Sequence, residues 1–262
     1  MILERSQHGL VQVLAMNRPE AANSLNPELF GALGQAFREI ATDDATRVVV
    51  LTGTGERIFC AGMDLRAFSE AWNDSSGGGG GATGHEWGES GPGYDPKTLS
   101  PKPVIAAVNG AAVGGGFELA LSCDLVVAAD TARFGLPEVK RGLIAGGGGT
   151  LLGTRLPLSL ALEVALTGEL ISAAQAFTWG LVNRVVPPAE LLDASLALAA
   201  TIAANGPIAL RTTKELVRRA VLDDPKLGWA TPEESSAVFG SEDAKEGAQA
   251  FLEKRAPSWN AR

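Results

Sequence analysis

The sequence predicts an α/β fold with parallel strand pairing. Four short stretches are apolar and rich in Val or Ile, as buried strands are: residues 9–16, 47–52, 103–108 and 124–128. Between the first two, residues 27–44 carry apolar side chains at helical spacing. Strands that alternate with helices favour parallel pairing, because each helix carries the chain back across the sheet.

Signals at the helix ends support these assignments. Asn26 is the expected N-cap of the helix at 27–44, and Pro27 stands at its first position. A further helix is expected to begin near Gly116, where helical spacing follows a strand and a run of glycines.

After a strand-like segment at 181–187, the rest of the chain is predicted to be helical. One helix, at 189–205, ends against Gly206, a common stop residue, and the next spans 207–222. The last helix, at 241–255, has acids in its first turn and bases in its last, which suits the helix dipole. A capping box with proline at the first helical position is expected at Thr231, Pro232 and Glu234.

One segment is unlike the others. Residues 72–94 contain the run SSGGGGGATG, which cannot pack a core and predicts a mobile surface loop over about residues 72–98. The loop fits either a tolerated insertion or a lid over a substrate site.

The composition excludes several classes of protein. No apolar run approaches the roughly 20 residues that span a bilayer, so we expect no membrane association. The amino terminus, MILERSQHG, has charges where a signal peptide has its apolar core, and we expect a cytoplasmic protein. The net charge of -8 argues against a nucleic-acid partner.

The cysteines and histidines indicate no metal site and no nucleophilic mechanism. Cys60 and Cys123 have apolar neighbours and are expected as small core residues, without a disulfide and without ligands at metal spacing. His8 is expected in a polar turn and His85 in the glycine-rich loop, so a Ser-His-Asp or Cys-His arrangement is poorly supported.

Two glutamates are the best indication of function. Glu118 and Glu138 lie 20 residues apart in apolar, glycine-rich surroundings, each just after a predicted strand. A carboxylate in such surroundings is costly to bury and needs a hydrogen-bonded partner or a chemical role. Taken singly, Glu118 could be an acid favoured by a helix dipole and Glu138 a plain loop carboxylate. If they share one pocket, they form an acid/base pair.

Two glycine-rich turns could supply backbone donors. Gly114, Gly115 and Gly116 precede the predicted helix, whose unpaired N–H groups could stabilise an oxyanion. A tight strand–helix packing turn explains these glycines equally well. In the second turn, FCAGMDL, the amide of Met63 could face the same pocket, and Asp64 is expected as a cap or hydrogen-bond anchor.

Together these residues resemble the crotonase superfamily, which contains the enoyl-CoA hydratases and isomerases. The resemblance covers almost the whole chain, through six blocks in order: NRPEAANSL, LTGTGERIFCAGMDL, KPVIAAVNGAAVGGGFELALSCDLVVA, ARFGLPEVKRGL, LTGELISAAQAFTWGLVNRVVP and EGAQAFLEKR. It implies a spiral of β-β-α units followed by a helical trimerisation region. We therefore divide the chain into an α/β core, residues 1–195, and a helical oligomerisation region, residues 196–262.

The resemblance also implies a role for each site residue. An oxyanion hole formed by the amides of Met63 and Gly115 would hold the thioester oxygen of an acyl-CoA. Glu118 would activate and orient a water molecule, and Glu138 would handle the proton that reaches Cα. CoA is part of the substrate, and no separate cofactor is expected. Further contacts to the acyl-CoA are implied for Ala22, Ala61, Asp64, Leu65, Gly114, Phe251 and Lys254.

The implied assembly is a trimer or a dimer of trimers, in which Phe251 and Lys254 can reach a neighbour's CoA. From the local sequence, however, Lys254 is better explained as a simple cation at a helix end. The chain also departs from the family pattern. Ala21 and Ala22 replace basic residues that often contact CoA phosphates, and residues 144–146 replace a common Pro-Gly pair.

The leading hypothesis is an enoyl-CoA hydratase that adds water to a trans-2-enoyl-CoA. Its rivals are another enolate reaction on an acyl-CoA, such as double-bond isomerisation or thioester hydrolysis, and a non-catalytic acyl-CoA-binding protein. A dinucleotide-binding enzyme is disfavoured because the glycine fingerprint is not present. The acyl group, the pathway and the choice between trimer and hexamer stay open.

Overall fold

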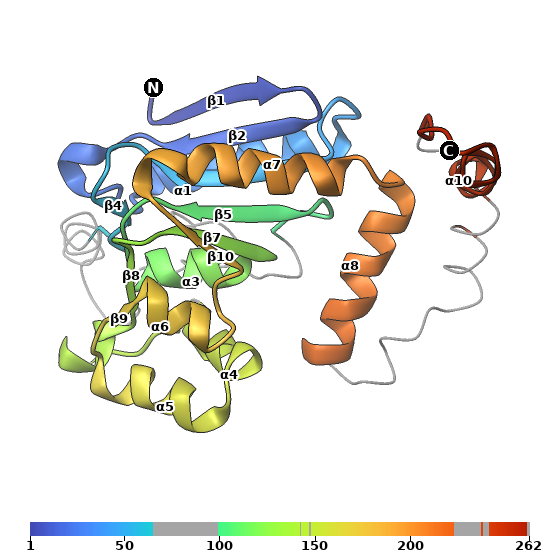
Figure 1. The fold of residues 1–262 in the computed structure, drawn as a ribbon. Helices are drawn as coiled ribbons and strands as arrows, with labels where there is room; N and C mark the ends of the chain where they lie inside the picture. The colour runs from blue at the N-terminus through green and yellow to red at the C-terminus, as the bar shows by residue number, and fades with distance from the viewer. Residues whose placement is uncertain (65–98, 142, 147, 223–236, 238–240, 261–262) are drawn as a thin grey trace, which may run out of the picture.

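The computed structural model describes residues 1–64, 99–141, 143–146, 148–222, 237 and 241–260. Its strands form two sheets, one of six strands and one of four (Figure 1). The glycine-rich loop and the capping box predicted at Thr231 lie outside the described residues.

The large sheet has the order β1-β2-β3-β5-β7-β10. Every neighbouring pair is parallel except β1 and β2, which confirms the predicted pairing. The prediction missed β1, a polar edge strand in which only Leu3 is buried, and His8 ends this strand instead of lying in a turn. The strands are β1 Leu3–His8, β2 Val11–Met16, β3 Val48–Gly53, β5 Val104–Val108, β7 Leu125–Ala129 and β10 Arg184–Val186.

The small sheet contains β4 Ile58–Cys60, β6 Ala111–Val113, β8 Arg133–Gly135 and β9 Ile171–Ser172. Each of β4, β6 and β8 follows a strand of the large sheet after a short turn, so the chain alternates between the two sheets. After β6 comes helix α3, Gly115–Ser122. These repeated units are the expected β-β-α spiral, and the fold class is confirmed.

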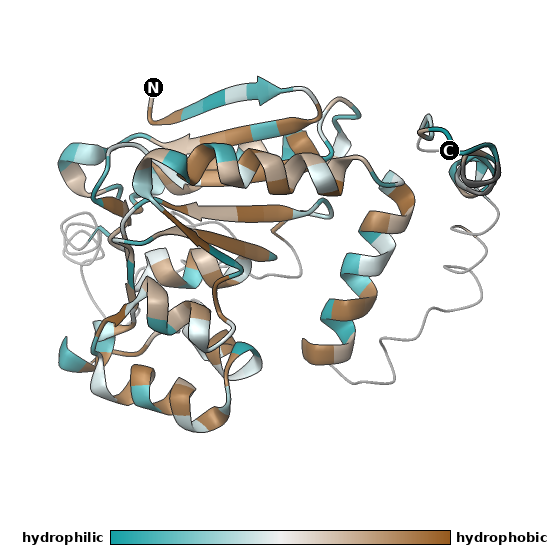
Figure 2. Ribbon diagram, in the orientation of Figure 1, coloured by the Kyte–Doolittle hydropathy of each residue, from teal (hydrophilic) through white to brown (hydrophobic). Residues whose placement is uncertain are grey.

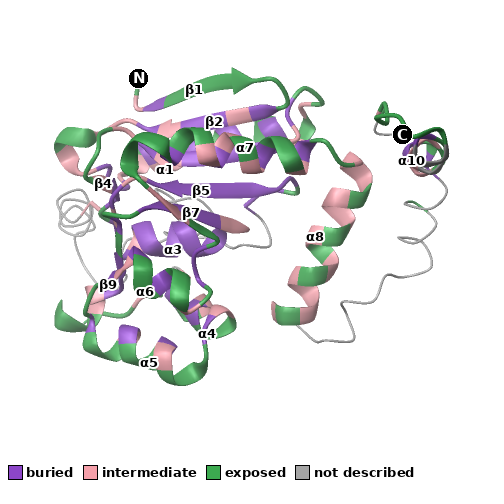
Figure 3. Cartoon of the chain, viewed as in Figure 1, coloured by how far each residue is buried: buried purple, intermediate pink, exposed green. Residues whose placement is uncertain are grey.

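Helices cover both faces of the large sheet. Side chains alternate along each strand: Leu51 and Ala106 pack with α1 and α3, whereas Val50 and Ile105 pack with α7. Helix α1, Pro27–Thr42, begins as predicted, because the side chain of Asn26 accepts a 2.9 Å hydrogen bond from the amide of Leu29. The central strands and α3 are the most completely buried part of the fold (Figure 3).

The carboxy-terminal helices extend away from this core. Helix α7, Leu191–Ala203, crosses the sheet, and α8, Pro207–Leu222, leaves it at 105° without one fully buried residue (Figures 1 and 3). The boundary predicted between residues 195 and 196 falls within α7. No single described helix is long and apolar enough to cross a bilayer, and only the bent α7–α8 pair meets that criterion jointly.

The remaining elements are short. Helix α10, Glu242–Glu253, carries the predicted acids in its first turn. Apolar side chains are exposed on α5 and α8, among them Leu158, Leu166 and Val217. Figure 2 colours both helices partly brown, the colour of hydrophobic residues. The other helical elements are η1 Pro19–Ala21, η2 Pro137–Arg141, η3 Gly149–Leu151, α4 Leu152–Arg155, α5 Leu158–Thr167, α6 Ala173–Thr178 and η4 Pro188–Glu190.

Candidate active site

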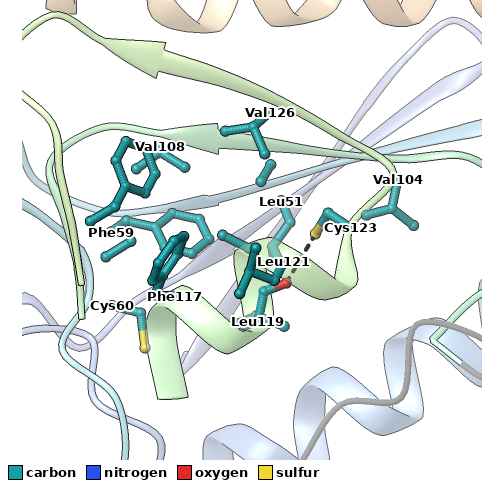
Figure 4. Packing of buried hydrophobic residues seen from close by; sticks show 14 of the residues in the cluster. Leu51, Phe59, Cys60, Val104, Val108, Phe117, Leu119, Leu121, Cys123 and Val126 are labelled. Carbon is teal, nitrogen blue, oxygen red and sulfur yellow. Dashed lines mark hydrogen bonds between the residues drawn. The ribbon is translucent and has the colours of Figure 1, made fainter. Parts of the chain in front are cut away.

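Glu118 is a buried carboxylate in the first turn of α3. Its neighbours from Gly116 to Ser122 are all buried, and Figure 4 shows Phe117, Leu119 and Leu121 within the core. The ring centroids of Phe117 and Phe134 are 5.5 Å apart. Only 6% of Glu118 is exposed, and its Oε1 accepts a 2.8 Å hydrogen bond from the amide of Gly149. The apolar packing of α3 and the hydrogen bond from Gly149 therefore hold the Glu118 carboxylate in one position.

Glu138 lies in η2, just after strand β8, and is partly buried. Its Oε2 is buried without a hydrogen-bond partner among the described residues. Burial raises the pKa of Glu138 above its usual value, against smaller opposing effects from its own backbone amide and from Arg141. Burial thus stabilises the protonated form of this carboxyl group relative to a carboxyl group in water.

The turn at Gly114 and Gly115 brings the two glutamates together. A Cβ atom built on Gly114 would lie 2.9 Å from Oε1 of Glu138, and one built on Gly115 would lie 3.7 Å from Oε2 of Glu118. Gly114 also has φ of +57°, which side-chain-bearing residues rarely adopt. Only glycine allows both the backbone conformation and the close approach of Glu138.

The predicted donor amides lie close together at the same turn. Gly115 is the first residue of α3, so its N–H has no partner within the helix. A Cβ built on Gly115 would lie 3.4 Å from the nitrogen of Met63. Among the described residues neither amide donates to a protein acceptor. Two unpaired donors beside two carboxylates can bind a developing oxyanion.

Local hydrogen bonding explains the direction of the Met63 amide. Met63 and Leu25 form an isolated parallel bridge, in which Leu25 N donates to Gly62 O (2.8 Å) and Asp64 N donates to Leu25 O (2.9 Å). In such a bridge the N–H of the intervening residue, Met63, points to the other side. That side is the one that holds Gly115.

The remaining predicted contacts are scattered. Ala22 has the left-handed conformation, and its carbonyl oxygen accepts a hydrogen bond from the amide of Ala61. Ala61 is an exposed residue. Asp64 forms an ion pair with Arg18. Leu65 lies outside the described residues, and so does the side chain of Phe251 within α10.

Lys254 is exposed just beyond α10, with φ of +56°. In Figure 1, α10 lies far from α3, beyond α8 at the right of the view. The structure therefore does not bring Lys254 to the glutamates of its own chain, whereas it does bring together Met63, Gly114, Gly115, Glu118 and Glu138.

Sequence reasoning missed two residues at this site. The amide of Gly149, which holds Glu118, lies in the run GGGG, where only the replaced Pro-Gly pair drew attention. Arg18, the partner of Asp64, belongs to the block NRPEAANSL and is the basic residue retained there. The available signal was that Arg18 is the one basic residue of this block, in which Ala21 and Ala22 replace others.

In the part of the chain that the structure describes, the cysteines and the acidic groups form no second reactive centre. Cys60 and Cys123 are free and fully buried, as predicted, and burial raises the pKa of each thiol to about 12. Within the described ranges no group of three His, Cys, Asp or Glu residues could hold a metal ion. A cavity of about 690 Å³ lies between α8 and the end of α3, but neither catalytic candidate lines it.

Comparisons with known proteins agree with this geometry. The family model described as enoyl-CoA hydratase/isomerase matches residues 6–262. Carnitinyl-CoA dehydratase from Proteus mirabilis is 38% identical over 267 residues, covering 99% of this chain and 98% of the relative. The crystal structure of enoyl-CoA hydratase from Mycobacterium tuberculosis has a TM-score of 0.86 at 41% identity, covering 100% and 99% of the two chains.

A further solved structure, enoyl-CoA hydratase from Bacillus anthracis, has a TM-score of 0.87 at 35% identity and covers both chains fully. The match therefore extends over the sequence, the two-sheet spiral and the carboxy-terminal helices. The chain belongs to the enoyl-CoA hydratase/isomerase family of the crotonase superfamily.

Proposed function

We propose that this protein is an enoyl-CoA hydratase, which adds water across the Cα–Cβ double bond of a trans-2-enoyl-CoA. The family acts on acyl-CoA thioesters by hydration and dehydration. The observation that carries the proposal is the convergence of two carboxylates and two unpaired amides on the turn at Gly114 and Gly115.

The amides of Met63 and Gly115 bind the thioester oxygen. Negative charge grows on this oxygen as water attacks Cβ and an enolate forms. Donors that are already fixed need no reorganisation at that moment, so they stabilise the transition state more than the bound substrate. Loss of one such donor typically lowers the rate by about 100-fold or more.

The glutamates have different environments and take different roles. Glu118, held by Gly149, accepts a proton from water as the oxygen bonds to Cβ. Glu138, whose pKa is raised by burial, gives its proton to Cα. Net proton transfer from Glu118 to Glu138 then restores the starting state. One molecule of water is consumed, with OH on Cβ and H on Cα.

A second candidate reaction is dehydration of a 3-hydroxyacyl-CoA such as carnitinyl-CoA. Relatives from Proteus mirabilis and Salmonella typhi that are 38% and 39% identical are named carnitinyl-CoA dehydratase. The chemistry is the same reaction run backwards, so both candidates use the same groups. Carnitine carries a quaternary ammonium group, and the two therefore differ in acyl recognition and not in mechanism.

One spectroscopic experiment tests both candidates. The purified protein is given short and long trans-2-enoyl-CoA esters, and the loss of the conjugated thioester absorbance is followed. In a parallel assay it is given carnitinyl-CoA, whose dehydration would increase the same absorbance. Decay with an enoyl-CoA supports the hydratase, and gain with carnitinyl-CoA alone supports the dehydratase. Binding of CoA esters without any change would favour the non-catalytic binding protein.

A further inference from the structure

The loop that carries Met63 is held from one side by a short segment of the chain. Besides the two hydrogen bonds around Leu25, the amide of Ala61 donates to Ala22 O at 3.1 Å. Residues 61–64 and 22–25 therefore lie side by side, joined by three backbone hydrogen bonds. The Met63 amide can point steadily at the oxyanion only if this pair keeps its register.

Arg18 joins the two pieces of this pair. One guanidinium nitrogen, Nη1, donates a 2.6 Å hydrogen bond to the carbonyl oxygen of Ser24, and the other, Nη2, donates to Oδ2 of Asp64 at 3.1 Å. Ser24 directly precedes the bridged residue Leu25, and Asp64 directly follows Met63. A single side chain thus spans the bridge beside the donor amide.

The backbone of Arg18 is itself held in place. Its backbone amide donates to Oδ1 of Asn23, a residue with no exposed surface and φ of +51°. The side-chain amide of Asn23 donates in turn to the carbonyls of Thr54 and Ile58, at 3.0 Å each. Through Asn23, Arg18 is therefore anchored to Thr54, in the loop before β4, and to Ile58, in β4 itself.

The ion pair is shielded enough to affect geometry. The side chains of Arg18 and Asp64 are each 17% exposed. Removing the charge of either side chain weakens the link between Ser24 and Asp64, so the two chain segments can shift relative to each other. A shift of about 1 Å in a positioned group can cost about 100-fold in rate.

We propose that Arg18 and Asp64 are positioning residues that fix the Met63 amide for oxyanion binding; this inference rests on the proposed function of that amide. Neither side chain needs to touch the reacting atoms. The ion pair aligns residues 61–64 on residues 22–25, and the Met63 N–H is directed toward Gly115 as a consequence.

The test compares Arg18→Met and Asp64→Asn with a control pair, Arg5→Met and Glu39→Gln. Arg5 and Glu39 also form an ion pair, but at the surface between β1 and α1. For the Arg18 and Asp64 variants we expect kcat to fall about 10- to 100-fold with KM close to that of the wild type. The control variants should keep both constants, and circular dichroism should show all four folded.

A second readout separates positioning from general damage and does not depend on turnover. A chromophoric enoyl-CoA bound to the wild type should absorb further to the red than in water, because the two amides polarise its carbonyl. Arg18→Met and Asp64→Asn should lose most of this shift while still binding the ester, and Arg18→Lys should restore part of it. An unchanged shift, or an effect confined to KM, would overturn the inference.

Failure of the proposed function gives a different pattern. In that case the wild type would bind the chromophoric ester with a red shift but hydrate no enoyl-CoA. The positioning of the Met63 amide could then still be measured through the shift alone.

Discussion

The backbone amide of Gly149 donates a 2.8 Å hydrogen bond to Oε1 of Glu118, across 31 residues of sequence. A backbone N–H can only donate, so this contact fixes Oε1 as an acceptor and leaves Oε2 on the side of Gly115. Gly149 is therefore part of the site and not merely of a connecting segment.

Replacing Gly149 by alanine should displace Glu118. The added Cβ would lie 3.2 Å from Oε1 of Glu118 and 2.4 Å from the Cβ of Ala145, so at least one of them must move. We expect kcat to fall on the order of 100-fold. Gly153→Ala is the matched control, because nothing lies within 4 Å of its added Cβ. Equal rates for the two variants would remove Gly149 from the mechanism.

Replacing Gly114 by alanine should damage activity and stability together. Its φ of +57° disfavours any side chain, and the new Cβ would meet Oε1 of Glu138 at 2.9 Å. We expect a loss of about 1–3 kcal/mol in the free energy of unfolding. Gly9→Ala, with φ of +60° and open space around its Cβ, carries backbone strain alone. Steady-state kinetics should therefore show a lower kcat only in Gly114→Ala. A comparable decrease of kcat in both variants would mean that backbone strain, and not the contact with Glu138, is the cause.

The raised pKa of Glu138 makes stability depend on pH in a defined direction. Its folded-state pKa lies above the ordinary value of 4.5, so the native state holds a proton that the unfolded chain has lost. This contribution to stability is complete below pH 4.5 and disappears as pH rises through the folded-state pKa. Glu138→Gln should therefore gain stability relative to the wild type as the pH increases from about 4.5.

Urea unfolding at a series of pH values measures this difference. The exposed acid Glu163, replaced by glutamine, serves as the control. If the stability of Glu138→Gln instead falls relative to that of the wild type as the pH rises, burial is not the cause. In activity, the need for a protonated Glu138 predicts a decline of kcat on the alkaline side of the same pKa.

The N-cap of α1 offers a prediction about stability alone. Asn26→Ala removes the 2.9 Å hydrogen bond to the amide of Leu29. We expect the free energy of unfolding to fall by about 1 kcal/mol, measured by urea denaturation, with kcat unchanged. A stability equal to that of the wild type would mean that water replaces the cap without cost.

Local signals predicted the elements that depend on local sequence. Asn26 and Pro27 identified the start of α1, and α8 spans the predicted 207–222, because capping and apolar spacing act within a few residues. Strand β1 was missed because LERSQH is polar at the sheet edge. The three-residue strands β6 and β8 are too short for a periodicity to be read from them.

The site was predictable only where local sequence indicates it. Glu118 and Glu138 stood out as carboxylates in apolar surroundings, but their meeting at Gly114 depends on how two sheets alternate along the chain. The roles of the Met63 and Gly115 amides came from the family resemblance and not from local pattern. The contacts of Gly149 and Arg18 are tertiary, and no spacing in the sequence encodes them.

The most direct test of the central claim is turnover of a trans-2-enoyl-CoA in ¹⁸O-labelled water, with the products followed by mass spectrometry. A hydratase gives an intact CoA ester that has gained one labelled water at C3, and Glu118→Gln and Glu138→Gln should each lower that rate by about 100-fold or more. Free CoA with label in a carboxylic acid, or an isomer of unchanged mass, would contradict hydration and assign these glutamates to another enolate reaction.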